Sequence, residues 1–336
     1  MYERAEESGR ARGVVQAARS RHPTDPATRC CIPQSCHSCT DKRVAGTVVE
    51  TLERCSVPDY QLRNRQKNER KAVSWEPFTA QHAIERVRIV LHFTQTIQPK
   101  QISSLAALVE AKRTELELGP QTSTNTNVVE LDASTGEARI SKQPSGWSFS
   151  KTTSDGAAVE VVLLNPQFLL YEAATYDHWE NFWPRYDAIT SDLRGRIHSD
   201  INVRAVALEY LDRFRFEGDV GAAEPGLLVS DAIVGSLPDS VRSGRELWHV
   251  HRGWFEGDEP SRYLVNQNFD AQSVQDPEGT EVRSIALATK VERQSATGDL
   301  DISSLPDDIE VMHALSKRVV RGTLSDDMCK RVGLAE

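Results

Sequence analysis

A long amphipathic helix followed at once by an alternating apolar strand constrains the fold of this chain more than any other feature. The helix is predicted by large apolar side chains that recur every three or four residues: Trp179, Phe182, Trp183, Tyr186, Ile189, Leu193 and Ile197. The strand is predicted by period-two apolar positions: Val206, Leu208, Tyr210, Phe214 and Phe216. We expect these aromatic residues to form core; a platform that stacks bases or a ring ligand is the alternative.

Strands alternate with few helices along the rest of the chain. Strand-like runs are predicted at 84–93, 147–149, 159–164, 167–173, 247–255, 262–269 and 281–291, and further helices at 102–116 and from Pro306 onward. This order is typical of an α+β fold, with a mostly antiparallel sheet and helices on one face. A β-α-β-β order at 83–174 that recurs at 178–336 further predicts a pseudo-duplicated layout, either ferredoxin-like or TATA-binding-protein-like.

Two signals compete for the start of the long helix. Asp177 with Glu180 three residues later resembles a capping box. Pro184 instead favours a helix that begins there or kinks, because proline inside a helix costs about 3 kcal/mol.

Residues 1–82 differ in composition from the rest of the chain. Hydrophobic positions are sparse and non-periodic there, whereas Arg, Ser, Gln, Pro and Glu are common. Such composition predicts a poorly ordered leader. The other interpretation is a start-site artefact. In that case the true start codon lies further downstream, and the leader is not part of the protein that the cell makes. We therefore expect a single α+β body over residues 83–336.

Charge and cysteine usage restrict the partners and the compartment. Residues 1–82 carry 14 Lys+Arg and 10 Asp+Glu, whereas residues 83–336 carry 26 and 39, a net charge of −13. An acidic body disfavours a nucleic-acid partner, although it leaves room for a local basic cleft. The sequence has no apolar run long enough for a membrane helix and no apolar core of a secretory signal. We expect a cytoplasmic protein with reduced cysteines and no membrane partner.

Three segments resemble motifs of a known family. The first is Tyr176-x-x-Trp179-x-x-Phe182, the second is the strand from Arg204 to Phe214 around Tyr210, and the third runs from Leu300 through Met312-His313 to Met328. In this order they resemble the prokaryotic family called "sporadically distributed protein", over residues 83–335. The chain departs from the family in having Leu211-Asp212 for Ile-Asn, in Pro184 and in the extra leader. The resemblance implies a fold and a scattered distribution, but no catalytic residues.

Two groups of residues are candidate metal ligands. Cys36 and Cys39 have zinc-knuckle spacing, but no second Cys-x-x-Cys pair accompanies them, so fortuitous cysteines in the leader are the alternative. His249 and His251 share one face of a predicted strand, but the facing strand offers only the amides Asn266 to Asn268. We therefore expect no bound metal and no cofactor. His178 and His313 are expected to have structural roles in helices.

Three arginines are the candidate anion-binding or partner surface. Arg204, Arg213 and Arg215 are predicted to cluster near Tyr210, with Arg213 and Arg215 on one face of the strand, where they could bind an anion. The alternative is that they pair with acidic neighbours. A nucleic-acid-binding or RNA-processing protein would need them to line a cleft with Arg283 and Arg318.

The sequence contains no assembled catalytic motif. It has no Gly-x-Ser-x-Gly nucleophile turn and no glycine-rich phosphate loop. The catalytic residues therefore stay unknown. We expect a non-enzymatic binding or interaction module that acts with a co-encoded protein partner in an accessory or defence cassette. The alternative is the nucleic-acid-binding or RNA-processing protein with an arginine-lined cleft.

Overall fold

The computed structural model describes residues 74–79, 82–131, 138–243, 247–258, 262–275 and 279–335. All of them belong to one compact unit, Leu62–Glu336. Cys36 and Cys39 lie outside the described residues.

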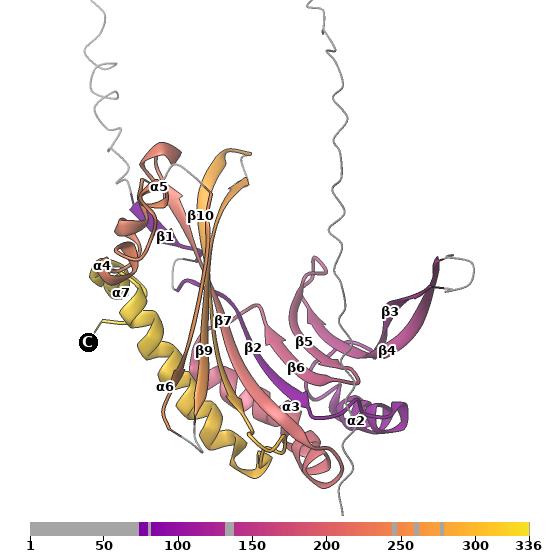
Figure 1. The fold of residues 1–336 in the computed structure, drawn as a ribbon. Coiled ribbons are helices and arrows are strands. Elements are labelled where there is room, and N and C mark those ends of the chain that lie inside the picture. The colour runs from indigo at the N-terminus through magenta and orange to yellow at the C-terminus, as the bar shows by residue number, and fades with distance from the viewer. Residues whose placement is uncertain are drawn as a thin grey trace, which may run out of the picture. The chain divides into compact units, whose positions relative to one another are not determined.

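A ten-stranded sheet forms the centre of this unit (Figure 1). Its strands are β1 Ser74–Pro77, β2 Ile84–Phe93, β3 Thr122–Leu131, β4 Ala138–Thr152, β5 Ala158–Leu164, β6 Phe168–Ala173, β7 Val203–Glu217, β8 His249–Glu256, β9 Tyr263–Gln275 and β10 Glu281–Gln294. The order across the sheet is β3-β4-β5-β6-β2-β7-β10-β9-β8, β1 also pairs with β7, and every pairing is antiparallel.

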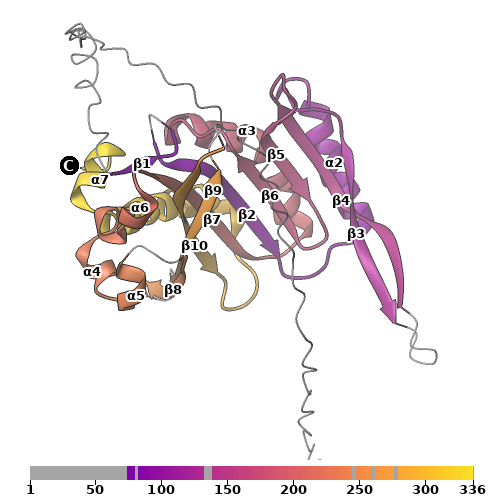
Figure 2. The ribbon, with the colours of Figure 1, turned by 90° about the horizontal axis from the view of Figure 1, so that it is seen from above.

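Three long helices cover one face of the sheet, so the α+β class is confirmed. The helices of the described residues are α2 Pro99–Lys112, α3 Trp179–Asp200, α4 Asp231–Val234, α5 Asp239–Arg242, α6 Leu305–Thr323 and α7 Asp326–Arg331. One core cluster joins Leu105 of α2, Leu193 of α3 and Met312 of α6 to Leu208 of β7. Figure 2 shows the β3–β4 hairpin at one end of the sheet and α4 and α5 at the other.

The opposite sheet face carries paired charges. On it, Arg88 of β2 contacts both Glu172 of β6 and Glu209 of β7, with a distance of 2.5 Å to Glu209. Lys290 contacts Glu292 at 2.7 Å. Alternation along each strand explains this division, since successive side chains point to opposite faces.

The strand order places β2 beside β7 at the middle of the sheet. β6, β5 and β4 follow outward from β2, and β10, β9 and β8 follow outward from β7. Whether the segments 83–174 and 178–336 are related repeats in a ferredoxin-like or TATA-binding-protein-like layout stays a prediction.

The long helix begins before its proline. α3 starts at Trp179 after the N-cap residue His178, whose side chain makes no capping hydrogen bond. The predicted capping box of Asp177 and Glu180 is therefore wrong. So is the prediction that the helix starts at Pro184, which lies in its second turn. Burial of the apolar face of α3 offsets the backbone hydrogen bond that proline removes there.

An ordered strand lies inside the segment that the sequence assigns to the leader. In β1, Trp75 is only 1% exposed, its ring packs against Phe216 at 5.2 Å, and its Nε1 donates to the carbonyl of Glu224 at 3.0 Å. Arg331 of α7 also donates to the Trp75 carbonyl. The structure thus makes Ser74–Pro77 part of the body, whereas residues 1–73 lie outside the described ranges.

None of the helices in the described part of the chain is long and apolar enough to cross a bilayer.

Candidate functional site

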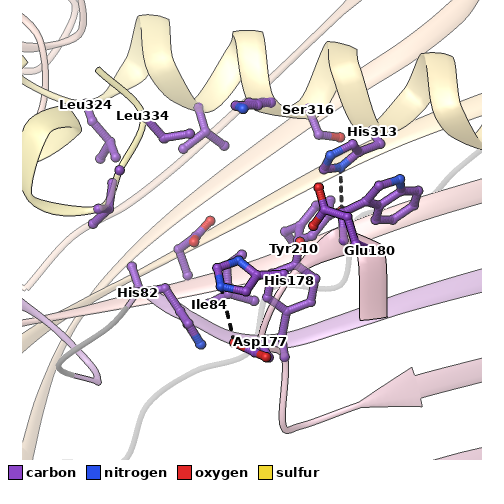
Figure 3. A pocket seen from close by; sticks show the side chains of 18 residues that line it. His82, Ile84, Asp177, His178, Glu180, Tyr210, His313, Ser316, Leu324 and Leu334 are labelled. Atoms are coloured by element: carbon purple, nitrogen blue, oxygen red, sulfur yellow. Dashed lines mark hydrogen bonds and ion pairs between the residues drawn. The ribbon is translucent and has the colours of Figure 1, made fainter. Parts of the chain in front are cut away.

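A cavity of about 600 Å³ opens between the start of α3 and the middle of α6, on the helix-covered side of β7 (Figure 3). We call it the α3–α6 pocket. Its walls come from the start of β2, the turn before α3, β7, α6 and the chain after α7. Segments more than 200 residues apart in sequence therefore meet around one space.

Aromatic and imidazole rings form one wall of the pocket. The Tyr210 hydroxyl and His313 Nδ1 are 2.9 Å apart and share a hydrogen bond. Trp179 stacks on His313 with ring centroids 4.0 Å apart, and its Nε1 donates to Glu310 at 2.9 Å. Tyr176 packs edge-on against Tyr210, with ring centroids 5.9 Å apart. These contacts hold the wall in one arrangement.

Burial disfavours the charged forms of the Tyr210, Tyr176 and His313 side chains in this wall. Burial raises the pKa of Tyr210 well above its usual value and that of Tyr176 to about 12. Burial also lowers the pKa of His313, although Glu310 opposes this effect. The wall therefore offers hydrogen-bonding groups and ring surface.

Asp212, which also lines the pocket, is a buried carboxyl without a partner among the described residues. It lies two residues after Tyr210 on the same face of β7 and is 6% exposed. Its cross-strand neighbours are the apolar Ile84 and Leu287. No described residue makes a hydrogen bond or ion pair with it, and burial alone raises its pKa to about 7.

Two further polar atoms in the pocket wall lack partners among the described residues. They are Ser316 Oγ, on α6, and His82 Nδ1, before β2. Ser316 lies one helical turn after His313, and Figure 3 shows both on the side of α6 that faces Tyr210. A buried polar group without a hydrogen bond costs about 1–3 kcal/mol, so each is a place where a ligand can add a bond.

β7 and α6 run past the pocket in the same direction. Leu208 and Met312, which precede the Tyr210–His313 contact, belong to one core cluster. Phe214 and Val320, which follow it, belong to another. Along β7, Asp212 thus lies between a residue of the first cluster and one of the second, and on α6 Ser316 follows His313 by three residues.

The structure does not bring the three candidate arginines together. Arg213 pairs with Glu85 at 2.6 Å, and Arg215 lies over the Phe78 ring at 5.4 Å. Arg204 lies at the other end of β7. A strand rises about 3.3 Å per residue, so Arg204 is roughly 30 Å from Arg213.

The wider arginine set does not line one cleft either. Arg204 and Arg215 line separate hollows. Arg318 pairs with Glu256 at 3.2 Å, and Arg283 is 7% exposed on β10.

The two predicted strand histidines lie on the open sheet face. His249 Nδ1 is 3.9 Å from Asp270 of β9, and His251 contacts Asn268. Sequence reasoning missed Asp270 as the carboxylate beside His249. Within the described ranges, no three His, Cys, Asp or Glu side chains are placed to hold a metal ion.

Sequence reasoning also missed the pocket. Its signal is Asp212 itself, a charged residue at a buried position of the alternating run from Val206 to Phe216. Ser316 is a weaker signal of the same kind, since it borders the apolar stripe of α6. Of the aromatic residues predicted as core, Phe182, Tyr186 and Tyr210 are buried, whereas Trp179 is only partly buried. Tyr210 and Trp179 also line the pocket.

The sequence matches no protein-family model and no curated protein. The three segments that carry the resemblance stated above nevertheless meet at the α3–α6 pocket, through Tyr176 and Trp179, Tyr210, and His313.

Proposed function

We propose that this chain is a non-enzymatic binding module of the prokaryotic cytoplasm that recognises a partner protein through the α3–α6 pocket. One observation carries the proposal: among the described residues, neither the carboxyl of the nearly buried Asp212 nor the buried Ser316 Oγ has a partner, and both residues line the pocket. Folding alone does not compensate the cost of such groups, whereas a ligand that pairs with them would.

The architecture around the pocket supports recognition of another chain. The pocket opens beside the exposed side chains of Asp177 and His178, so an inserted side chain can stay connected to a backbone outside. The Tyr210–His313–Trp179 contacts supply a preorganised wall, which lowers the entropic cost of binding. We further propose that the partner is encoded beside this chain, since the scattered distribution that the resemblance implies suits an accessory or defence cassette.

The nucleic-acid alternative has weaker support from the same structure. Arg213 and Arg318 pair with glutamates, and the open sheet face carries carboxylates beside its cations. Such pairing leaves little positive charge for phosphate groups.

A peptide-display selection on the purified full chain tests the proposal. Peptides enriched on the wild type should not bind a Ser316→Phe variant, in which the ring would occupy the pocket. A melting transition like that of the wild type must show that the variant folds. Asp177 is exposed beside the pocket, so the larger side chain of Asp177→Trp should narrow the pocket opening. This substitution serves as a second variant with a blocked pocket. Failure to enrich any peptide, or equal binding to both blocked variants and the wild type, contradicts the proposal.

A further inference from the structure

We propose that the α3–α6 pocket binds an alkylammonium group, such as the end of a lysine side chain, with Asp212 as its counter-ion. This inference rests on the proposed function and names the chemistry of the group that the pocket takes.

Asp212 differs from the other buried carboxylates of the described residues in having no cation. Asp308 is 5% exposed and pairs with Arg293. Glu292 is 7% exposed and pairs with Lys290 at 2.7 Å. Asp212 is buried to the same degree, yet its neighbours provide neither an ion pair nor a hydrogen bond. At Asp308 and Glu292 the fold supplies the cation of the ion pair. At Asp212 the cation of a ligand would form the corresponding ion pair.

The remaining polar groups suit a donor with several N–H bonds. An ammonium group has three donors and no acceptor. Asp212 accepts one or two of these, and Ser316 Oγ, beyond the same Tyr210–His313 contact, accepts another. A carboxylate or phosphate ligand would instead face Asp212 with like charge once that group ionises.

The charge of the wall also favours a cation. Asp177, Glu180 and Asp212 line the pocket, against one lysine, Lys317, and the three imidazoles of His82, His178 and His313. Lys317 makes no ion pair with Asp212 and therefore does not neutralise it. The rings of Tyr176 and Trp179 add surfaces that attract cations.

The apolar part of the lining suits the stem of such a ligand. Six apolar side chains contribute to it: Ala83, Ile84, Val320, Leu324, Val332 and Leu334. A lysine side chain joins four methylene groups to a compact ammonium, and burying these methylenes against apolar side chains favours binding. An aliphatic stem with a charged end thus matches a pocket of apolar walls with a carboxyl in its lining.

Isothermal titration calorimetry at pH 8 with three small probes tests this inference on the full chain. The probes are Nα-acetyl-lysine methylamide, its Nε-acetylated form, which lacks the charge, and spermidine, a free polyamine. The charged lysine probe should bind the wild type, and the Nε-acetylated form should not. Asp212→Asn should weaken binding roughly tenfold or more, because a hydrogen bond to a charged group contributes about 1.5–3 kcal/mol.

Asp258→Asn is the matched control, since it removes one exposed carboxylate outside the pocket and should leave the affinity unchanged. Ser316→Ala should weaken binding several-fold without changing the net charge. Melting curves of each variant separate a lost site from a lost fold.

The outcomes distinguish this inference from the function on which it rests. If only spermidine binds, with the same dependence on Asp212, the ammonium site is supported and a lysine of a partner protein is not. Equal binding of the neutral probe, unchanged affinity in Asp212→Asn, or no binding of any probe overturns the inference. Displayed peptides that need the pocket but lack lysine would overturn it too, while the proposed binding function would stand.

Discussion

Asp212→Asn should stabilise the folded chain, and the gain should grow as the pH rises. Burial raises the pKa of Asp212 to about 7, whereas an aspartate in an unfolded chain has a pKa of about 3.9. Between these values the folded state keeps a proton that the unfolded state has released. The stability of the wild type therefore falls as the pH rises from about 4 to about 7 and then stays at the lower level.

The structure sets the size of this effect. One pKa unit corresponds to about 1.36 kcal/mol, so the difference between the two pKa values costs the wild type about 4 kcal/mol above pH 7. At pH 4.5 the same relation leaves a cost of about 1 kcal/mol. Because Asp212 is only 6% exposed, solvent screening removes little of this cost. Asparagine has the same shape and no charge, so Asp212→Asn should raise the free energy of unfolding by about the amount that the buried charge costs the wild type.

Urea unfolding of the wild type and of Asp212→Asn at pH 4.5 and pH 8 measures the difference. Every other titrating group is shared by the two proteins, so the change in their stability difference between the two pH values belongs to residue 212. Asp258→Asn provides the baseline for losing an exposed carboxylate. A stability gain that is the same at both pH values, or a variant less stable than the wild type at pH 8, would refute the reasoning about Asp212.

Three further predictions concern other parts of the chain. Trp75→Ala should lower the free energy of unfolding by about 3–5 kcal/mol, because the ring is fully buried under β7; a loss below about 1 kcal/mol in urea unfolding would mean that β1 is not part of the body. Trp179→Ala should cost less than Trp75→Ala, because Trp179 is only partly buried, and it should weaken the binding of pocket-dependent peptides; full binding would remove Trp179 from the site. Metal analysis of the protein purified without chelators should find clearly sub-stoichiometric zinc, iron and manganese. A tightly held equivalent that His249→Ala or Cys36→Ser removes would show the opposite.

Several elements of the fold were predictable because their signal is local. The helical spacing from Trp179 to Ile197 predicts α3, and the alternation from Val206 to Phe216 predicts β7, the strand at the middle of the sheet. The Asn165-Pro166 turn between β5 and β6 is equally local. Such patterns follow from the 3.6- and two-residue periods of helix and strand, which need no knowledge of distant residues.

Elements with weak periodicity were not predicted. β3 is rich in Thr and Asn, and its apolar positions do not alternate clearly. β1 lies in a segment whose average composition is that of a disordered chain. Its order depends on Trp75, whose ring packs against Phe216 and whose carbonyl accepts a hydrogen bond from Arg331. The contact with Arg331 joins the two ends of the described chain.

By itself, the sequence determined the fold class, the central helix and strand, and the acidic charge of the body, since these depend on periodicity and composition. Only the tertiary structure decided where function could reside. It paired Arg213 with Glu85 and Arg318 with Glu256, and it brought Asp212 next to a pocket formed with α6, about 100 residues later. The physical reason is that desolvation and the absence of a partner are properties of a side chain's surroundings in space. No local pattern contains them, although an acid within an apolar strand marks where to look.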